Sequence, residues 1–289
     1  MHSFLKAVGF SKVTKREEMK EIILDVIKNY DEKKVVEEHP DGTFAQFSRF
    51  YGKDCGITVC GQYDDDNRFH VEYYYPFFKG TGVTTQEQVT VERHADKDAF
   101  SVACDDLRIG ITLIFYLQNA AEYMKERKKQ LTGNQPLTLS GLAGEGKILF
   151  PVLKDKEAVK VEQESSKTRS SLIAAARDGD EEAMENLTME EMDTYSMLST
   201  RIVHEDILSI VDSYFMPYGI QCDQYSILGE IIEYHEVQND ITDEELVQMT
   251  LECNNIRFDV CINREDLLGD PAVGRRFKGT IWLQGQIHF

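Results

Sequence analysis

The sequence predicts an α+β protein, with an N-terminal antiparallel sheet packed with helices, then a helical hairpin and a small antiparallel β-barrel or half-barrel, for which an OB-like form is one option. Near the start, one helical stripe of apolar residues is followed by short aromatic and β-branched segments between turn residues. The C-terminal segments alternate between apolar and polar positions. The 289 residues also exceed the ~250 at which one core usually stops growing, which favours two domains.

The first expected element is a helix. Its apolar positions recur with a 3.6-residue period at Met19, Ile22, Ile23, Val26, Ile27 and Tyr30. Thr14 and Glu17 have the spacing of a capping box, in which two side chains satisfy backbone N–H groups of the first turn.

An antiparallel meander is expected next. Its strands are rich in aromatic and β-branched residues and lie near 43–51, 56–63, 68–78, 87–93 and 98–104. A long helix is then predicted over 111–130, although the residues at its start also alternate as a strand would. Two extended pieces, near 137–142 and 147–153, complete this unit.

Charge and composition divide the chain. Residues 166–289 hold 9 Lys+Arg against 24 Asp+Glu, a net charge of −15, while the rest of the chain accounts for only −4 of the total of −19. Residues 154–170 are charged and Ser-rich, and the run that starts at Ser171 resembles the two helices of one ankyrin-type repeat. Because repeat stacks need about three copies, a plain helical hairpin is the better interpretation. We therefore expect an α+β domain at 1–153, a linker at 154–170, and a helical hairpin plus antiparallel β domain at 171–289.

The C-terminal domain is predicted to hold about five strands. Residues 247–253 and 256–262 alternate on either side of Asn254-Asn255, and Asn tolerates the positive φ of a two-residue hairpin turn. The last strand, from Phe277 to Phe289, alternates over its whole length. With extended stretches near 213–221 and 225–237, these strands indicate the small barrel or half-barrel.

The net charge of −19 argues against nucleic acid and anionic membranes as partners, because both are bound by clustered Lys and Arg. Six cysteines without a Cys-x-x-Cys pair in a long chain do not form a disulfide framework. The apolar content of the N-terminus is too short for a signal peptide. A cytoplasmic protein with reduced thiols is expected.

No cofactor or metal site is predicted. Residues Gly141 to Lys147 have the Gly-x4-Gly-Lys spacing of a phosphate-binding loop, but Ile148 stands where a Ser or Thr must hold Mg²⁺, so turn glycines between two strands are the better interpretation. His70 with Glu72, and His94 near two aspartates, lack the clustered ligands of a structural zinc site.

The strongest candidate for a binding site lies in the last strand. Trp282, the only tryptophan, lies on its polar face with Lys278, just after Arg275 and Arg276. Aromatic and Arg side chains are typical of interface hot spots, so these four residues are predicted to bind a protein partner or a small anionic ligand. For Trp282 itself, packing on the protein's own N-terminal unit or helical hairpin is the favoured interpretation and binding is the alternative, because an aromatic side chain on a polar strand face usually covers something.

The favoured function is therefore non-catalytic binding, since no nucleophile elbow or triad spacing is found. The rival hypothesis is an enzyme of unrecognised class. Its site would lie in a cleft between the two domains and would draw on His70, Glu72, Tyr74 or His94. The sequence predicts no oligomeric state.

Four stretches resemble an uncharacterised family of Gram-positive bacterial proteins, classed as a domain of unknown function. They are MHSFLKAVGFSK at Met1, GDEEAMENLTMEEMDTYSMLS at Gly179, FMPYGIQCDQYS at Phe215 and VGRRFKGTIWLQG at Val273. The resemblance covers essentially the whole chain. It implies a bacterial cytosolic protein of about this length and assigns no catalytic or ligand residues.

Overall fold

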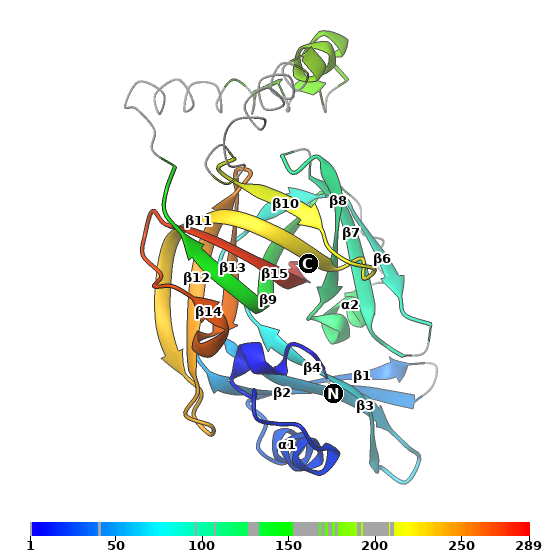
Figure 1. Cartoon of the computed structure of the whole chain (residues 1–289). Coiled ribbons are helices and arrows are strands. Elements are labelled where there is room, and N and C mark those ends of the chain that lie inside the picture. The colour runs from blue at the N-terminus through cyan, green and yellow to red at the C-terminus, as the bar shows by residue number, and fades with distance from the viewer. Residues whose placement is uncertain are drawn as a thin grey trace.

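The computed structural model describes residues 2–289 except 40–41, 96, 107, 127–132 and most of 153–210, within which only short stretches between 168 and 192 and residue 208 are described. The described chain is mostly β and forms two sheets (Figure 1). Its α-helices include α1 (Arg16–Lys28), α2 (Ala120–Glu126) and a helical stretch at 181–189. The predicted α+β class is therefore wrong, because segments expected to be helical or irregular are strands.

The smaller sheet is a four-stranded antiparallel meander in sequence order. Its strands are β1 (Glu32–His39), β2 (Gly42–Gly52), β3 (Cys55–Tyr63) and β4 (Phe69–Phe78). Helix α1 lies on the outer side of this sheet, against β2 and β3 (Figure 1). Its capping box begins one residue later than predicted, since Glu18 accepts from the backbone N–H groups of Thr14 and Lys15.

The larger sheet has eleven strands and includes segments from both expected domains. The strands from the N-terminal half are β5 (Thr85–Glu87), β6 (Val89–Arg93), β7 (Phe100–Asp106), β8 (Ile111–Leu117) and β9 (Gln135–Leu149). The strands from the C-terminal half are β10 (Tyr214–Pro217), β11 (Gln224–Gln238), β12 (Glu245–Cys253), β13 (Ile256–Asn263), β14 (Leu267–Leu268) and β15 (Arg276–Ile287).

Five strands of the larger sheet pair in a closed circuit, in the order β11, β12, β13, β9, β15 and back to β11. The predicted barrel drew only on C-terminal strands, whereas β9 comes from the N-terminal half and pairs in parallel with β13. The predicted hairpin turn is confirmed, since Asn254 and Asn255 both have positive φ, 48° and 62°. The expected domains at 1–153 and 171–289 stay a prediction.

Two segments differ from their predicted elements. The helix expected over 111–130 is strand β8 followed by the short helix α2. The pieces expected at 137–142 and 147–153 are one strand, β9, so the glycines from Gly141 to Gly146 lie within a strand and not in a turn. A Cβ at Gly146 would clash with the ring of Phe277 on the facing strand, and one at Gly141 would approach Ile281 to 2.9 Å. These glycines therefore make room for large side chains of β15.

The linker expected at 154–170 and most of the hairpin expected from Ser171 lie outside the described residues. Arg276 forms hydrogen bonds with the chain at both ends of this stretch. Its guanidinium donates hydrogen bonds to the carbonyl oxygens of Phe150 (3.0 Å), Val211 (2.8 Å) and Leu208 (2.8 Å), and the residue is buried.

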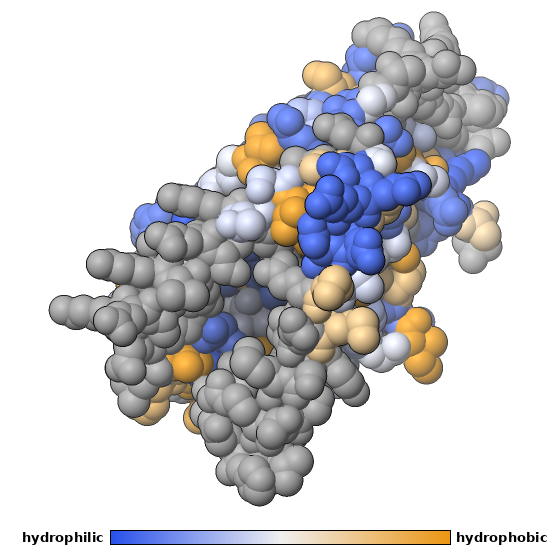
Figure 2. Space-filling model, turned by 90° about the horizontal axis from the view of Figure 1, so that it is seen from above, coloured by the Kyte–Doolittle hydropathy of each residue, from blue (hydrophilic) through white to orange (hydrophobic). Residues whose placement is uncertain are grey.

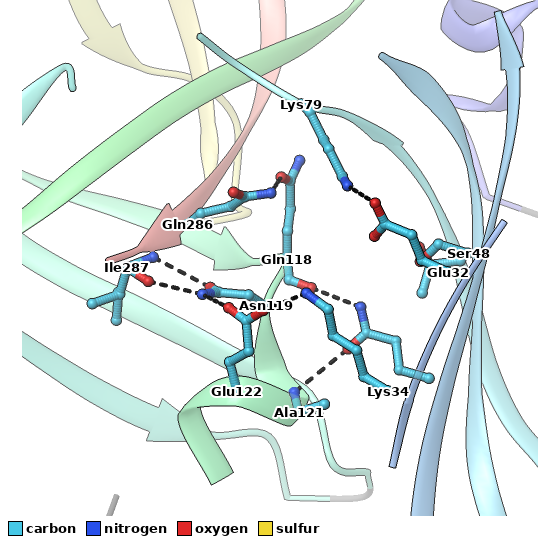
Figure 3. A network of polar contacts seen from close by, with 12 residues as sticks. Glu32, Lys34, Ser48, Lys79, Gln118, Asn119, Ala121, Glu122, Gln286 and Ile287 are labelled. Carbon is cyan, nitrogen blue, oxygen red and sulfur yellow. Dashed lines mark hydrogen bonds and ion pairs between the residues drawn. The ribbon is translucent and has the colours of Figure 1, made fainter. Parts of the chain in front are cut away.

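The two sheets meet partly through a polar network around Gln118 and Asn119, between β8 and α2 (Figure 3). The Gln118 carbonyl accepts hydrogen bonds from Gln46 of β2 (2.9 Å) and Tyr75 of β4 (3.0 Å). Lys34 of β1 forms an ion pair with Glu122 of α2. Because each buried polar group in this network needs its partner, the contacts fix how the smaller sheet sits on the larger one.

No helix among the described residues has both the length and the apolar character needed to cross a membrane. On the face seen in Figure 2, hydrophobic residues occur in separate groups between hydrophilic ones. Scattered exposure of this kind is ordinary for a protein surface.

Candidate functional site

A pocket of about 500 Å³ opens beside Trp282, and we call it the Trp282 pocket. Four parts of the chain form it. They are residues 2–4 at the N-terminus, the β6–β7 connection with its flanking Ser101, the aromatic pair Tyr116 and Trp282 on β8 and β15, and residues 220–224 before and at the start of β11. Ligand sites in proteins are typically concavities of roughly 300–1,000 Å³ with mostly apolar walls and a few polar groups.

Trp282 forms the aromatic floor of the pocket and is 5% exposed. Its ring centroid lies 4.4 Å from that of His2, 5.9 Å from Phe4 and 5.1 Å from Tyr116. The indole N–H donates a 2.7 Å hydrogen bond to Asp223 Oδ2. The apolar N-terminus therefore packs on the last strand: Phe4 is buried, and the 3-10 helix that follows it, Leu5–Val8, lies against β4, β9 and β13.

The connection between β6 and β7 supplies the polar wall. His94 Nε2 and Ser101 Oγ are 2.8 Å apart, and Ser101 lies directly opposite Tyr116 in the β7–β8 ladder. The Lys97 ammonium lies 5.1 Å from the ring centroid of Tyr73. Because Ser101 and Tyr116 share one face of the sheet, the hydroxyl and the phenol ring face the same pocket.

Residues 218–223 connect β10 to β11 and, together with Gln224, form the rim. Ile220 and Cys222 are exposed, and the Tyr218 N–H donates to the Gln224 carbonyl at 2.9 Å. Asp223 is held from the other side as well, because its carbonyl accepts from the Leu283 N–H at 2.9 Å. The rim thus presents one exposed thiol and one anchored carboxylate to the pocket.

The pocket keeps its imidazoles neutral at pH 7. Burial, and then the positive charge of Lys97, lowers the pKa of His2 from 6.5 to about 4. The same two causes lower the pKa of His94, while the charge of Asp223 opposes the shift. Burial also raises the pKa of the Tyr116 phenol well above its ordinary value. The charged groups among the lining residues are therefore Lys97 and Asp223.

Of the four residues predicted to bind a partner or ligand, Trp282 alone lines this pocket. Arg276 is buried and donates to three backbone carbonyls. Arg275 stacks over the ring of Phe150, with 5.5 Å from Cζ to the centroid, and Nη1 donates to the Asp270 carbonyl at 2.8 Å. Lys278 is half-buried near the start of β15. A role for these three basic residues in binding stays a prediction.

The four residues proposed for an enzymatic cleft also lie in different places. His94 lines the Trp282 pocket. His70, Glu72 and Tyr74 lie on β4, the end strand of the smaller sheet, and do not line it. His70 is exposed and sits 2.7 Å from Asp64 through its Nε2.

The sequence analysis missed most of the pocket. His2, Phe4, Lys97, Ser101, Tyr116 and Asp223 were not singled out, and the only signal for them was that two of the stretches carrying the family resemblance contain the N-terminus and residues 215–226. Sequence spacing cannot reveal a site made by four distant segments. Within the described residues, no group of three or more His, Cys, Asp or Glu side chains is placed to hold a metal ion.

Neither the curated proteins nor the solved structures contain a match to this chain. One family model matches residues 5–285 and is described as "Domain of unknown function, E. rectale Gene description (DUF3881)". Because the match spans nearly the entire sequence, the chain belongs to this family of proteins with a domain of unknown function.

Proposed function

We propose that the protein binds a small molecule in the Trp282 pocket, and that the ligand is a planar or aromatic carboxylate. The observation that carries the proposal is the pocket itself. It has a ligand-sized volume, a floor of Phe4, Tyr116 and Trp282, and a wall of mostly polar side chains. Such a floor desolvates a planar group, while the polar side chains of the wall orient it.

The charges favour a small anion. Lys97 lines the same pocket as His2 and His94, and its positive charge lowers the pKa of both imidazoles. Asp223, the anionic group of the pocket, already accepts the Trp282 indole N–H. A carboxylate near Lys97 meets a positive charge and two neutral imidazoles, which can each donate one hydrogen bond. Nucleic acid remains an unfavourable partner for a chain of net charge −19.

A protein partner is the alternative to a small ligand, and an enzymatic role is the alternative to simple binding. The site is concave, which suits a small ligand better than a protein surface, so we favour the ligand. The enzymatic alternative gains one specific observation, the pairing of His94 with Ser101. We also infer a bacterial cytosolic location, supported by the six cysteines, which are all free among the described residues.

The test uses Trp282 as a reporter. Because it is the only tryptophan, its indole N–H gives one resonance in a ¹H–¹⁵N spectrum of the full chain. Titration with 4-fluorobenzoate is expected to shift this resonance with saturation, whereas the cation 4-fluorobenzylamine is expected to leave it in place. A set of aromatic anions that all leave the indole resonance unmoved would contradict the proposal.

Lys97→Ala tests the charge, and Lys33→Ala is its matched control. Each ammonium lies over a tyrosine ring, Lys97 at 5.1 Å from Tyr73 and Lys33 at 5.2 Å from Tyr63, but Lys33 does not line the pocket. We expect Lys97→Ala to weaken 4-fluorobenzoate binding about tenfold, the effect of losing one partly buried charged contact. Lys33→Ala is expected to bind as the unmodified protein does, and equal losses in both variants would refute the assignment.

A further inference from the structure

One contact in the Trp282 pocket has the geometry of an activated nucleophile. His94 Nε2 and Ser101 Oγ are 2.8 Å apart, and both side chains line the pocket. A hydroxyl and a base within about 2.6–3.2 Å of each other are the basic requirement for nucleophilic catalysis. The spacing is fixed by the β6–β7 ladder, in which Arg93 pairs with Phe100, so that His94 directly follows one strand and Ser101 lies next along the other.

The surroundings suit His94 to the role of a base. Burial and Lys97 lower its pKa, so the imidazole is neutral at pH 7 and, with its proton on Nδ1, accepts the Ser101 hydroxyl proton at Nε2. Asp223 is near enough to favour the imidazolium that forms once the proton has moved. Lys97 places a positive charge in the same pocket, where a carbonyl oxygen that gains negative charge is stabilised.

We propose that the Trp282 pocket hydrolyses small carboxylic esters, with Ser101 as the nucleophile and His94 as the general base. This inference rests on the proposed function, because the acid released by hydrolysis is the same planar carboxylate that we expect the pocket to bind. The substrate is an ester of an aromatic or other planar acid, since the pocket floor is made of Phe4, Tyr116 and Trp282 rings.

The reaction proceeds in two half-reactions. Ser101 Oγ attacks the ester carbonyl carbon while its proton passes to His94 Nε2, and the bond from carbon to the alcohol oxygen then breaks as His94 returns the proton to that oxygen. The products of this half are an alcohol and an acyl-Ser101 ester. Water, activated in turn by His94, attacks the acyl carbon and restores Ser101 with release of the carboxylic acid. No electrons are gained or lost.

The chain offers a matched control outside the pocket. His288 Nε2 lies 2.7 Å from Thr138 Oγ1, the same kind of contact between an imidazole and a hydroxyl, and neither residue lines the Trp282 pocket. If proximity of the two groups alone produced reactivity, this pair would react as well. His288→Gln therefore separates the effect of the pocket from the effect of the contact.

The experiment combines covalent labelling with kinetics on the full chain. A fluorophosphonate probe is expected to modify Ser101, identified by peptide mass spectrometry, and Ser101→Ala is expected to lose that label. With p-nitrophenyl benzoate as the substrate, His94→Gln is expected to lower kcat/KM at least about 100-fold, the usual contribution of a general base. His288→Gln is expected to leave both the labelling and the rate unchanged.

Absence of label on Ser101, or hydrolysis by Ser101→Ala at the rate of the unmodified protein, would overturn the ester-hydrolysis proposal. Titration of Ser101→Ala with 4-fluorobenzoate separates this outcome from failure of the binding proposal. If the Trp282 indole resonance still shifts while the unmodified protein does not hydrolyse the ester, the binding proposal is supported and the ester-hydrolysis proposal is refuted. If neither the shift of the indole resonance nor the label on Ser101 is found, both proposals are refuted.

Discussion

His2 should titrate far below an ordinary histidine as long as the N-terminus stays packed on Trp282. Burial and Lys97 lower its pKa from 6.5 to about 4. The difference between those two values corresponds to about 3 kcal/mol, which is the cost of charging His2 in its packed position relative to water. Between pH 6.5 and about 4 the packed imidazole stays neutral, whereas an imidazole released into water binds a proton. Acidification therefore favours release of the N-terminal segment.

The packing of residues 2–4 on Trp282 therefore depends on pH. Packing of residues 2–4 is at full strength above pH 6.5 and weakens as the pH falls toward 4, by up to about 3 kcal/mol. Release of this short segment exposes the Trp282 ring, which is 5% exposed when covered. We therefore expect a local loss of packing, in which residues 2–4 leave the pocket before the sheets unfold.

The assay is a pH titration of the imidazole Cε1–H resonances by NMR, with His2→Gln to assign the signal. In native protein the His2 signal is expected to titrate with a midpoint near 4, and in concentrated urea the same signal should return to a midpoint near 6.5. A native midpoint between 6 and 7 would contradict the expected packing, because it would show an imidazole that is neither buried nor close to Lys97.

Three substitutions test the packing. Arg276→Met removes three charged hydrogen-bond donors from backbone carbonyls and is expected to lower the free energy of unfolding by about 3 kcal/mol in urea titrations followed by fluorescence. Gln118→Leu removes the side chain that bonds the Phe78 carbonyl at 2.8 Å and should cost about 2 kcal/mol by the same assay. Gly56→Ala places a Cβ against the Arg49 carbonyl on the neighbouring strand, so a lower thermal midpoint and a cost of about 3 kcal/mol are expected.

Each of these has a clear contrary result. An Arg276→Met protein as stable as the original would mean that water replaces the guanidinium at no cost. A neutral Gln118→Leu change would show that the side-chain hydrogen bonds of Gln118 contribute nothing to stability. Unchanged melting of Gly56→Ala would mean that β2 and β3 can separate locally without loss.

Alternation identified several strands even where both faces are largely buried, as in β13. The strand expected near 68–78 matches β4, and the Asn254-Asn255 turn matches the β12–β13 hairpin. The 111–130 segment failed because Leu113 and Leu117 are buried equally well on one face of a strand, and the helical period begins only at Ala120. Local patterns carry no information on which of two periods the tertiary packing will select.

The closed circuit of strands was beyond prediction for a different reason. It depends on the parallel contact of residues 140–143 with residues 259–262, far apart in the sequence. The Gly141 to Lys147 run resembled a nucleotide motif, but Gly141 and Gly146 are explained by the close approach of Ile281 and Phe277. Only the facing strand explains such a composition.

The candidate site was found in part. Trp282 and His94 were both singled out, but for different sites, because a sequence does not show that β15 and the β6–β7 connection face one pocket. Trp282 was noticed as a large aromatic on a polar strand face, and such a side chain usually covers or is covered by something. Lys97, Ser101 and Asp223 have no local pattern to distinguish them from surface residues.

The most direct test of the central claim, that the Trp282 pocket binds a small carboxylate, is the ¹H–¹⁵N spectrum of the full chain during a 4-fluorobenzoate titration. The Trp282 indole N–H, held by Asp223 at 2.7 Å, is expected to move in a saturable way, and Lys97→Ala should weaken the response about tenfold while Lys33→Ala does not. An indole resonance that stays fixed throughout the titration, while resonances elsewhere in the chain shift, would show that the carboxylate does not bind in the Trp282 pocket.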